Sequence, residues 1–591
     1  MKINKLPFMS RKNFTLFFTE RNFHLIISLL ISLVVAIFVQ CQVLINPLAI
    51  NDDVRNQIYW MARLIDPNLY PHDLIADYFT QSSLVSPVLW LIYKLGSYLT
   101  DPIQISQFLP LLLAPLASYF AYRFGENFAG KRYGFLSAFS FNMLVWLGRN
   151  LAGGLARSFA YPLLFAFLWC YSKNIRSGLI ITAWLASLIY PPILFLSTGV
   201  WLLGFLPPSF LNTSTAQPEN NKPDFITFLW GIGGGLAILI YRFVLTPIHP
   251  LFGQLTNSRL ASQTPEFYEG GRVPIFHFFH HPLTLTWPDS LLGELFARTP
   301  GASRLLPLAG ILLAAWGYKK WISPRLGKLK IPSLVWQLLI ASTLLYILAW
   351  LMLFYLYVPE RYLQFSMPVL YTFLLAGILN VLLDLIENSK LTARLKTGLL
   401  IAPFLFCILI FSKVWDQNLM LPQPDMLPVF EYLKQTPKNT MIATTPGLAS
   451  DIPFYAKRSV ILSQEGYIPF HQAYFQIMKK RLKDFLIAYY STDPEAVIRF
   501  IQQYKIDYIM VNRQDYLPER LRLLHKKYYH SFPKSFYRQL LQNDNGNQTF
   551  ILSHPQPSCQ VVHSGHYMLL PAKAILAGNC LIPLKSTKAS P

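Results

Sequence analysis

Apolar runs of about twenty residues, separated by short polar stretches, recur through the first two thirds of the chain. The first run, from about residue 24 to 46, contains no charged residue and is long enough to cross a bilayer as a helix. Further single spans are predicted at about 103–122, 225–246, 302–318, 334–357, 362–384 and 397–413, and helix pairs at about 134–172 and 177–207. The pattern predicts a polytopic α-helical membrane protein with about eleven transmembrane helices.

The cationic residues of this part lie in short clusters between the apolar runs, as they do in cytoplasmic membrane loops. Residues 1–22 precede the first span and are basic, so we expect a cytoplasmic N-terminus. Other basic clusters follow alternate spans, at 123–132, 173–176, 319–330 and 390–396. A transmembrane domain over 23–415 is therefore predicted to have two large outer loops, about 47–102 and 247–301, and to lie in the inner or plasma membrane.

The tail, residues 416–591, has charges spread through it and contains no further apolar run of spanning length. Helical patterns at 428–435, 472–490 and 494–504 alternate with strand-like runs at 440–445, 459–463 and 506–511. This alternation predicts an extracytoplasmic α/β domain. Cys559 and Cys580 both lie in it, where oxidising conditions permit a disulfide; two buried thiols are the alternative.

The composition excludes an ordinary soluble protein, because 53% of the 591 residues are apolar and only 14% are charged. Lys and Arg outnumber Asp and Glu by 51 to 29, but the excess lies in the predicted membrane loops. No basic helix or aromatic and basic platform outside the membrane part indicates nucleic acid.

An acidic pair, Asp52 and Asp53, follows the first span directly. A charged group costs about 3 kcal/mol in the bilayer interior and little at its surface, where the pair can meet water, headgroups and substrates. One carboxylate can serve as a general base. The other can orient the acceptor, pair with Arg55, or help to hold a divalent cation with Asp73 or Asp77. The alternative for the pair is a cap on an amphipathic interfacial helix predicted at about 54–65, with a solvated neighbour. Adjacent residues point in different directions, so we do not expect them to share one role.

Transfer of a sugar from a lipid-phosphate donor needs positive charge for the departing phosphate. Three further residues are candidates for binding this phosphate. Arg361 and Tyr362 lie in a short outer segment between two late spans, and Arg272 lies in the second outer loop. Arginine suits phosphate because its planar guanidinium donates two parallel hydrogen bonds. Anchoring of lipid headgroups is the alternative role for Arg361.

Candidates for contact with the acceptor or the cavity come from two outer segments. His72 and Asp73 lie in the first outer loop, and Arg149 and Arg157 lie at an outer turn between spans. Contact of the two arginines with the membrane surface is the alternative reading. If a metal ion binds, Asp52, Asp53 and Asp73 are its candidate ligands.

These features together resemble the GT-C superfamily of membrane glycosyltransferases, which use polyprenyl-phosphate sugar donors. The resemblance rests on the first span, the pair Asp52-Asp53 after it, the late segment 359–362 and the outer α/β domain. It implies inverting transfer of a sugar to an acceptor hydroxyl, with an aspartate of the first outer loop as base. By position Asp52 is the first choice.

Within the superfamily the chain is most similar to the bacterial mannosyl- and arabinosyl-type transferases. The tail lacks the Trp-Trp-Asp-Tyr-Gly signature of the oligosaccharyltransferase branch, so the resemblance favours a hexosyl or pentosyl monosaccharide donor. The acceptor stays open between a lipid, a polysaccharide and a protein. The resemblance leaves two alternatives for cofactors: none is required, or a divalent cation such as Mg²⁺ or Mn²⁺ is required.

Two other classes of function stay open. In a transporter or flippase of lipid-linked glycans, the acidic pair would bind a proton or an ion. The predicted spans are almost empty of Asp and Glu and show no inverted repeat, which disfavours a transporter. The third class is a non-catalytic protein that only binds glycan lipids.

Overall fold

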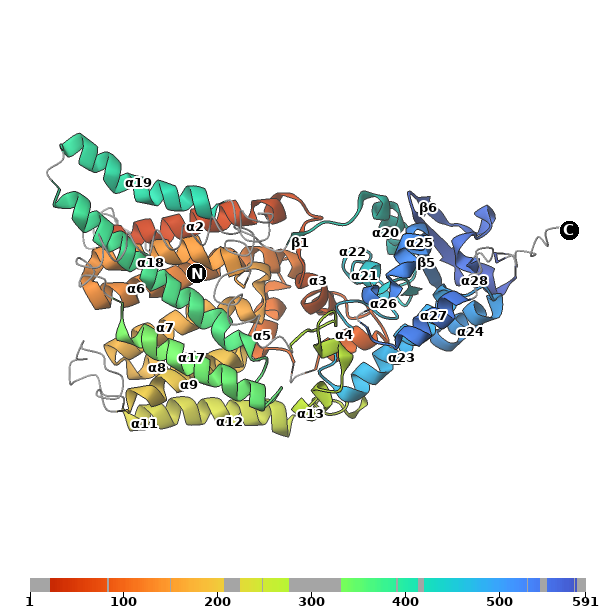
Figure 1. Cartoon of the computed structure of the whole chain (residues 1–591), viewed down its shortest axis with the longest axis horizontal. Helices are drawn as coiled ribbons and strands as arrows, with labels where there is room; N and C mark the ends of the chain where they lie inside the picture. The colour runs from red at the N-terminus through yellow and green to blue at the C-terminus, as the bar shows by residue number, and fades with distance from the viewer. Residues whose placement is uncertain are drawn as a thin grey trace, which may run out of the picture.

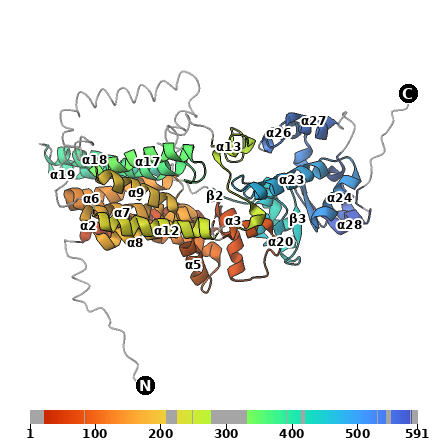
Figure 2. The same cartoon turned by 90° about the horizontal axis from the view of Figure 1, so that it is seen from below.

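The computed structural model describes residues 22–81, 84–148, 150–206, 224–246, 248–275, 331–389, 392–412, 419–528, 530–542, 550–578 and 580–581. These residues form a helical part and an α/β domain, which lie end to end along the long axis of the molecule (Figure 1). Figure 2 shows the same division from a second direction. The predicted span at 302–318 and the basic cluster at 319–330 lie outside the described residues.

The helical part is built from the apolar runs of the sequence. Its helices are α2 (Phe23–Ile45), α5 (Pro87–Gly96), α6 (Pro102–Leu144), α7 (Ala160–Lys173), α8 (Arg176–Ile189), α9 (Pro191–Gly204), α11 (Phe225–Phe228), α12 (Gly234–Ile240), α17 (Ser333–Leu351), α18 (Glu360–Glu387) and α19 (Ala393–Phe411). Among the described residues, five helices are long and apolar enough to cross a membrane: Phe23–Ile45, Pro102–Leu147, Phe225–Leu245, Ser333–Leu351 and Glu360–Glu387. The chain is thus a multi-pass membrane protein, and the count of about eleven spans stays a prediction.

One basic segment of the helical part, the turn at 123–132, lies beside the end of α18. Helix α6 bends sharply at Gly130, whose φ of 87° is open to glycine and strained for other residues. Just beyond the bend, Arg132 forms ion pairs with Asp384, at 3.1 Å, and with Glu387, at 3.0 Å, near the end of α18. The predicted basic turn at 123–132 therefore joins two antiparallel helices beside the last turns of α18.

The tail forms a five-stranded mixed sheet with the order β4-β3-β5-β7-β6. Its strands are β3 (Met441–Ala443), β4 (Ser459–Val460), β5 (Tyr508–Asn512), β6 (Val562–Ser564) and β7 (Tyr567–Pro571). Strands β4, β3 and β5 are parallel, whereas β7 and β6 form an antiparallel hairpin at one side. The prediction of an α/β domain is confirmed, although the hairpin was not predicted.

The helices of the domain are α20 (Leu427–Lys434), α21 (Pro446–Ala449), α22 (Ile452–Tyr455), α23 (Gln472–Tyr489), α24 (Pro494–Tyr504), α25 (Pro518–Arg522), α26 (Leu524–Lys527), α27 (Lys534–Gln542) and α28 (Ala572–Leu576). Three of them, α20, α23 and α24, match the predicted ranges, and the other six were not predicted. Helix α24 has the predicted bounds because Asp493 caps its first turn, accepting from the Glu495 N–H at 3.0 Å. It ends where Lys505 turns into the left-handed region, with φ of 50°.

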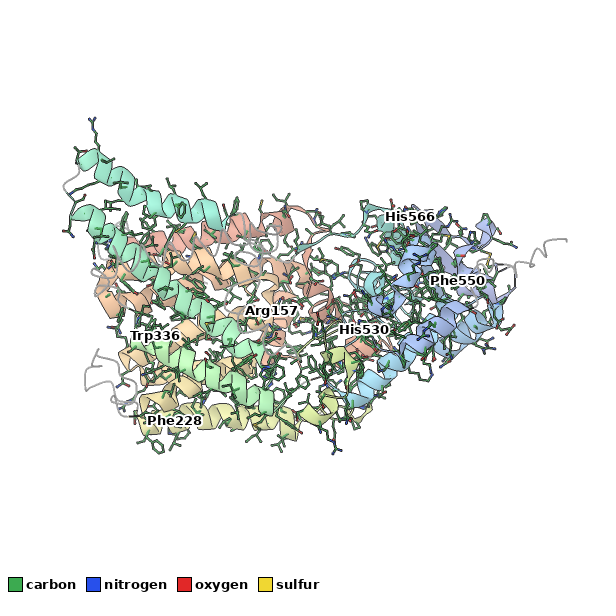
Figure 3. All side chains as sticks on the ribbon, viewed as in Figure 1. Arg157, Phe228, Trp336, His530, Phe550 and His566 are labelled. Atoms are coloured by element: carbon green, nitrogen blue, oxygen red, sulfur yellow. A yellow bond between two sulfur atoms is a disulfide. The ribbon has the colours of Figure 1, made fainter. Side chains whose placement is uncertain are left out.

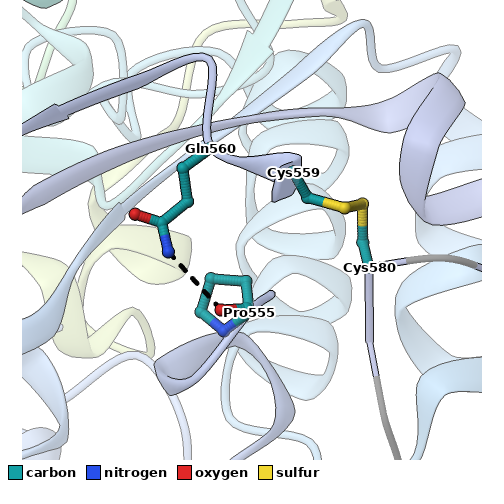
Figure 4. Close-up of a disulfide and its surroundings, with 4 residues drawn as sticks. All are labelled: Pro555, Cys559, Gln560 and Cys580. Carbon is teal, nitrogen blue, oxygen red and sulfur yellow. Dashed lines mark hydrogen bonds between the residues drawn. A yellow bond between two sulfur atoms is a disulfide. The ribbon is translucent and has the colours of Figure 1, made fainter. Parts of the chain in front are cut away.

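A disulfide joins Cys559 to Cys580, with a Cα–Cα distance of 5.6 Å (Figure 4). It links the turn before β6 to the segment after α28, and so encloses the β6–β7 hairpin. Closing a loop of this length stabilises a fold by about 3 kcal/mol in the chain-entropy account.

The first outer loop packs between the two parts of the molecule. Strand β1 (Ile50–Asn51) pairs antiparallel with β2 (Leu419–Met420), and the Tyr70 hydroxyl donates to the Pro453 carbonyl at 2.7 Å. The rings of Tyr78 and Tyr474 stack, with centroids 3.8 Å apart. The loop and the α/β domain therefore lie at the same end of the helical part.

The expected interfacial helix over about 54–65 is replaced by two short elements. Helix α3 (Val54–Gln57) is followed by a 3₁₀ helix, η1 (Tyr59–Leu64). Residues 58–61 are all 5% exposed or less, so none of these four side chains is left for a membrane surface. The physical reason is that four consecutive apolar residues cover every side of a short helix, and α6 and the α/β domain together bury them.

Candidate active site

A cavity of about 1430 Å³ lies where the helical part meets the α/β domain. Its walls come from the first outer loop, the α8–α9 junction, α12, the start of α18, the loop 248–275 and the segment 465–472. This volume exceeds that of an ordinary small-molecule pocket, which is about 300–1,000 Å³. The cavity has room for two substrates at once.

Asp53 lines the cavity and forms an ion pair with Arg157. Arg157 lies in a 3₁₀ turn, η4 (Ala156–Phe159), at the end of the helical part that faces the α/β domain (Figure 3). The preceding Gly153, with φ of 81°, lets this turn approach the start of the first outer loop. A Cβ atom at Gly153 would lie 3.0 Å from the Asn51 side-chain oxygen.

Three more arginines line the same cavity; one of them, Arg242, donates to the backbone carbonyls of Ser187 and Val85, and the other two lie near Asp53. Arg361 lies in the first turn of α18, and its Nη1 donates to the Gln364 Oε1 at 2.6 Å. No ion pair of Arg361 is found within the described residues. Arg272 donates from Nε to the Gln464 carbonyl at 2.7 Å and pairs with Glu465 at 2.7 Å. The cavity thus holds three guanidinium groups around Asp53.

The charges of the cavity keep Asp53 ionised. Burial raises the pKa of Asp53, but Arg157, and then Arg361 and Arg272, outweigh burial and hold this pKa below its ordinary value. At neutral pH the site therefore presents one carboxylate that can accept a proton. The guanidinium groups can meet the charge of a phosphate.

The neighbouring carboxylate has a different environment. Asp52 does not line the cavity and forms an ion pair with Arg55, which also donates to the Asp451 Oδ1 at 2.6 Å. Burial of Arg55, which is 8% exposed, lowers its pKa, but the two carboxylates outweigh burial and raise it. Pairing with Arg55 was one of the alternatives for the second aspartate. Asp52 and Asp53 thus have separate partners.

The other predicted site residues lie elsewhere. Asp73 is fully buried and caps α4 (Leu74–Phe79), accepting from the N–H groups of Ile75 at 2.9 Å and Ala76 at 3.0 Å. Burial raises the pKa of Asp73. His72 stands in the tight turn before it, with φ of 62°. Neither residue lines the cavity, because both serve the turn into α4.

Tyr362 and Arg149 complete the predicted set. Tyr362 is fully buried, and its hydroxyl donates to the Leu356 carbonyl instead of lining the cavity. It packs the start of α18 in place beside Arg361. Arg149 lies outside the described residues.

The residues present do not fit a divalent cation. Asp52 and Asp53 are each engaged by an arginine, and Asp73 is committed to the first turn of α4. Within the described part of the chain, no group of three or more His, Cys, Asp or Glu side chains is placed to hold a metal. A cation would have to displace a guanidinium from an ion pair.

The sequence interpretation missed the residues that the α/β domain supplies. Asp451 and Glu465 follow the carboxyl ends of β3 and β4, which point toward the junction with the helical part. Ligand-binding residues commonly follow the carboxyl ends of parallel strands. That rule was the one available signal, and it applies to both residues.

The Arg55–Asp451 ion pair gives a prediction about the junction. Asp451→Asn is expected to lower the free energy of unfolding by about 3 kcal/mol, because it leaves a buried guanidinium with one carboxylate in place of two. Thermal unfolding of the purified chain in detergent should show the loss. The matched control is Glu431→Gln, which removes an exposed carboxylate on α20. Equal unfolding temperatures for the two variants would contradict the structural role of Asp451.

Comparisons with known proteins show a distant structural likeness. No protein-family model and no curated protein matches the chain. Among solved structures, the apo oligosaccharyltransferase of Archaeoglobus fulgidus is similar at 12% identity and a TM-score of 0.48, over 86% of this chain and 72% of that chain. An Archaeoglobus fulgidus oligosaccharyltransferase in complex with an inhibitory peptide and a dolichol phosphate is similar at 11% identity and a TM-score of 0.46, over 88% of this chain and 72% of that one. At these values the likeness carries no argument about the reaction, which must rest on the cavity.

Proposed function

We propose that the chain is a membrane glycosyltransferase that moves one sugar from a polyprenyl-phosphate carrier to an acceptor hydroxyl. The observation that supports this most strongly is the cavity beside the membrane helices, in which Asp53 stands among Arg157, Arg272 and Arg361. Transfer from a lipid phosphate needs a base for the acceptor and positive charge for the departing phosphate. Both kinds of group line this one cavity.

The proposed step is a single inverting displacement. The acceptor oxygen attacks the anomeric carbon and forms the new glycosidic bond, while the bond from this carbon to the phosphate oxygen breaks. The electron pair of that bond leaves with polyprenyl phosphate, whose charge Arg361 and Arg157 stabilise. The acceptor proton passes to Asp53.

Asp53 is the better candidate for the base, although position along the chain put Asp52 first. Asp53 faces the cavity, and its lowered pKa keeps it ionised at neutral pH. Asp52 is tied through Arg55 to the α/β domain. We assign Asp52 a structural role, in which it helps Arg55 to connect the first outer loop to the α/β domain.

An apolar wall of the cavity supports a polyprenyl donor. It is formed by α12 and the turn after it, together with the segment that leads into α5, and its side chains are Leu84, Val85, Leu89, Leu236, Leu239, Ile240, Phe243 and Val244. Each buried CH₂ group of a lipid tail contributes about 0.8 kcal/mol, so such a wall favours an isoprenoid chain over a soluble sugar nucleotide. A flippase would move the lipid-linked sugar without cleaving it, and Asp53 would then bind only a proton or an ion.

The donor assay tests the proposal directly. The purified full chain in lipid nanodiscs is incubated with a panel of radiolabelled polyprenyl-phosphate hexoses and pentoses and with lipid, oligosaccharide and peptide acceptors, and both the release of polyprenyl phosphate and the transfer of label are measured. We expect release from at least one donor, with the anomeric configuration of the product inverted. Movement of intact donor across liposomes without any release would support the flippase instead.

The ion pair of Asp53 predicts how the rate depends on pH. A base works only when deprotonated, so the rate falls as the pH drops through the pKa of Asp53. Arg157→Gln removes the largest influence that lowers this pKa and leaves burial, which raises it. The acid limb of the profile of kcat/KM against pH should therefore move to higher pH in Arg157→Gln. It should move less in Arg157→Lys, and identical acid limbs in all three proteins would contradict the assignment.

A further inference from the structure

One wall of the cavity differs in chemistry from the surroundings of Asp53. Apart from the Arg272–Glu465 ion pair, its polar lining is neutral: five amide side chains and one imidazole, namely Asn56, Gln57, Gln254, Asn257, Gln472 and His471. The aromatic side chains that line the cavity beside them are Trp60, Tyr78, Phe79 and Phe470. Amides offer both donors and acceptors to hydroxyl groups, and aromatic rings pack against the C–H faces of sugars.

Contacts among three chain segments hold this neutral wall together. Asn56 donates from its amide to the Glu465 carbonyl at 3.3 Å. The Gln472 N–H donates to the Gln254 carbonyl at 3.0 Å, and Leu255 and His471 form an isolated antiparallel bridge. The first outer loop, the loop 248–275 and the start of α23 thus form one continuous surface.

His471 is fixed within this surface as a neutral group. Its Nδ1 lies 2.7 Å from the hydroxyl of Tyr78, which is itself 1% exposed. Burial lowers the pKa of His471 to about 4, so the ring is uncharged at neutral pH. With Nδ1 accepting from the Tyr78 hydroxyl, Nε2 carries the proton and is a hydrogen-bond donor.

The charged groups of this wall are already paired. Glu465 meets Arg272 at 2.7 Å, so neither presents a free charge to a ligand. An acceptor with phosphate or uronate groups would need a free cation here, and an amine would need a free carboxylate. The wall matches an uncharged ligand rich in hydroxyl groups.

We propose that the neutral wall, with His471 and Gln472 at its centre, is the acceptor subsite, and that it binds an uncharged glycan. The role of this glycan as acceptor rests on the proposed function, whereas its binding to the wall does not. The lipid phosphate is then assigned to Arg157 and Arg361, and the sugar that is extended to the neutral wall. Of the lipid, polysaccharide and protein acceptors left open by the sequence, this wall selects the polysaccharide.

Direct binding tests the subsite. Short neutral manno-, gluco- and arabino-oligosaccharides are titrated against the full chain in nanodiscs, beside uronic acid oligosaccharides and a peptide pool, and their dissociation constants are compared. At least one neutral series should bind more tightly than the acidic sugars and the peptides. Gln472→Ala and His471→Leu should each weaken that binding roughly tenfold, the usual effect of one lost hydrogen bond to a ligand. His471→Gln, which keeps a donor, should weaken it less.

Gln435→Ala is the matched control, because Gln435 is an exposed amide after α20 and does not line the cavity. Tighter binding of the acidic sugars or the peptides, or neutral binding equal in Gln472→Ala, His471→Leu and the control, would overturn the subsite. The donor assay on the unmodified chain is read separately. Neutral glycan binding without donor cleavage would overturn the proposed function and leave the subsite standing, and the reverse pattern would overturn only the subsite.

Discussion

Replacing Asp53 by Asn is expected to lower the rate of sugar transfer by about a thousandfold. The variant keeps the shape of the side chain and its place beside Arg157 but cannot accept the acceptor proton. Donor binding should survive, because the guanidinium groups of Arg157 and Arg361 remain in the cavity. Single-turnover transfer and binding of polyprenyl phosphate, measured on the same preparation, separate the two effects.

Asp52→Asn is the informative control for this experiment. It removes the neighbouring carboxylate, which pairs with Arg55 outside the cavity lining, so we expect a smaller loss of transfer and a lower unfolding temperature. A loss of transfer confined to Asp52→Asn would return the role of base to Asp52. Wild-type transfer by both variants would show that neither aspartate is the base.

The second large effect is expected at Arg361. Arg361→Gln should lower kcat/KM by about a hundredfold and weaken the binding of polyprenyl phosphate, because the leaving phosphate loses a charged donor of two hydrogen bonds. Arg361→Lys should recover part of the loss, since it restores the charge but not the planar fork. Both constants are measured with the purified variants in nanodiscs.

Arg499→Gln provides a matched control on the surface of α24, where the guanidinium is 69% exposed. A loss shared equally by Arg361→Gln and this control would point to a general effect of net charge. In that case Arg361 would have only the membrane-anchoring role that its position also allows.

Much of the fold could be predicted because the relevant signals are local. The bounds of α24 follow from Asp493, Pro494 and the left-handed Lys505, all within one short stretch. The β6–β7 hairpin was missed, although Gly565 carries the positive φ, 56°, that its two-residue turn requires. The segment 54–65 was predicted as one interfacial helix because periodicity does not reveal which distant domain will cover a helix.

The residues of the candidate site were also predicted only in part. Asp53, Arg157, Arg272 and Arg361 were all selected from the sequence by charge and position, and the structure brings them to one cavity. One partner of Arg55, Asp451, was not selected from the sequence, because it lies 396 residues further along the chain. No pattern within a short window reports an ion pair of that separation.

The α/β domain therefore has a part in the site as well as a fold of its own. Asp451 reaches the acidic pair through Arg55, and Glu465 reaches the cavity through Arg272. The carboxyl ends of β3 and β4 are thus held against the start of the first outer loop. Removal of the domain would expose the cavity around Asp53 to water and leave Arg55 and Arg272 without these carboxylates.

A density map of the full chain with a polyprenyl-phosphate sugar bound tests the central claim most directly. The account predicts that the phosphate contacts Arg361 and Arg157, that the lipid lies along the apolar wall near α12, and that the anomeric carbon faces Asp53. A phosphate bound outside this cavity, with Asp53 remote from the sugar, would contradict it.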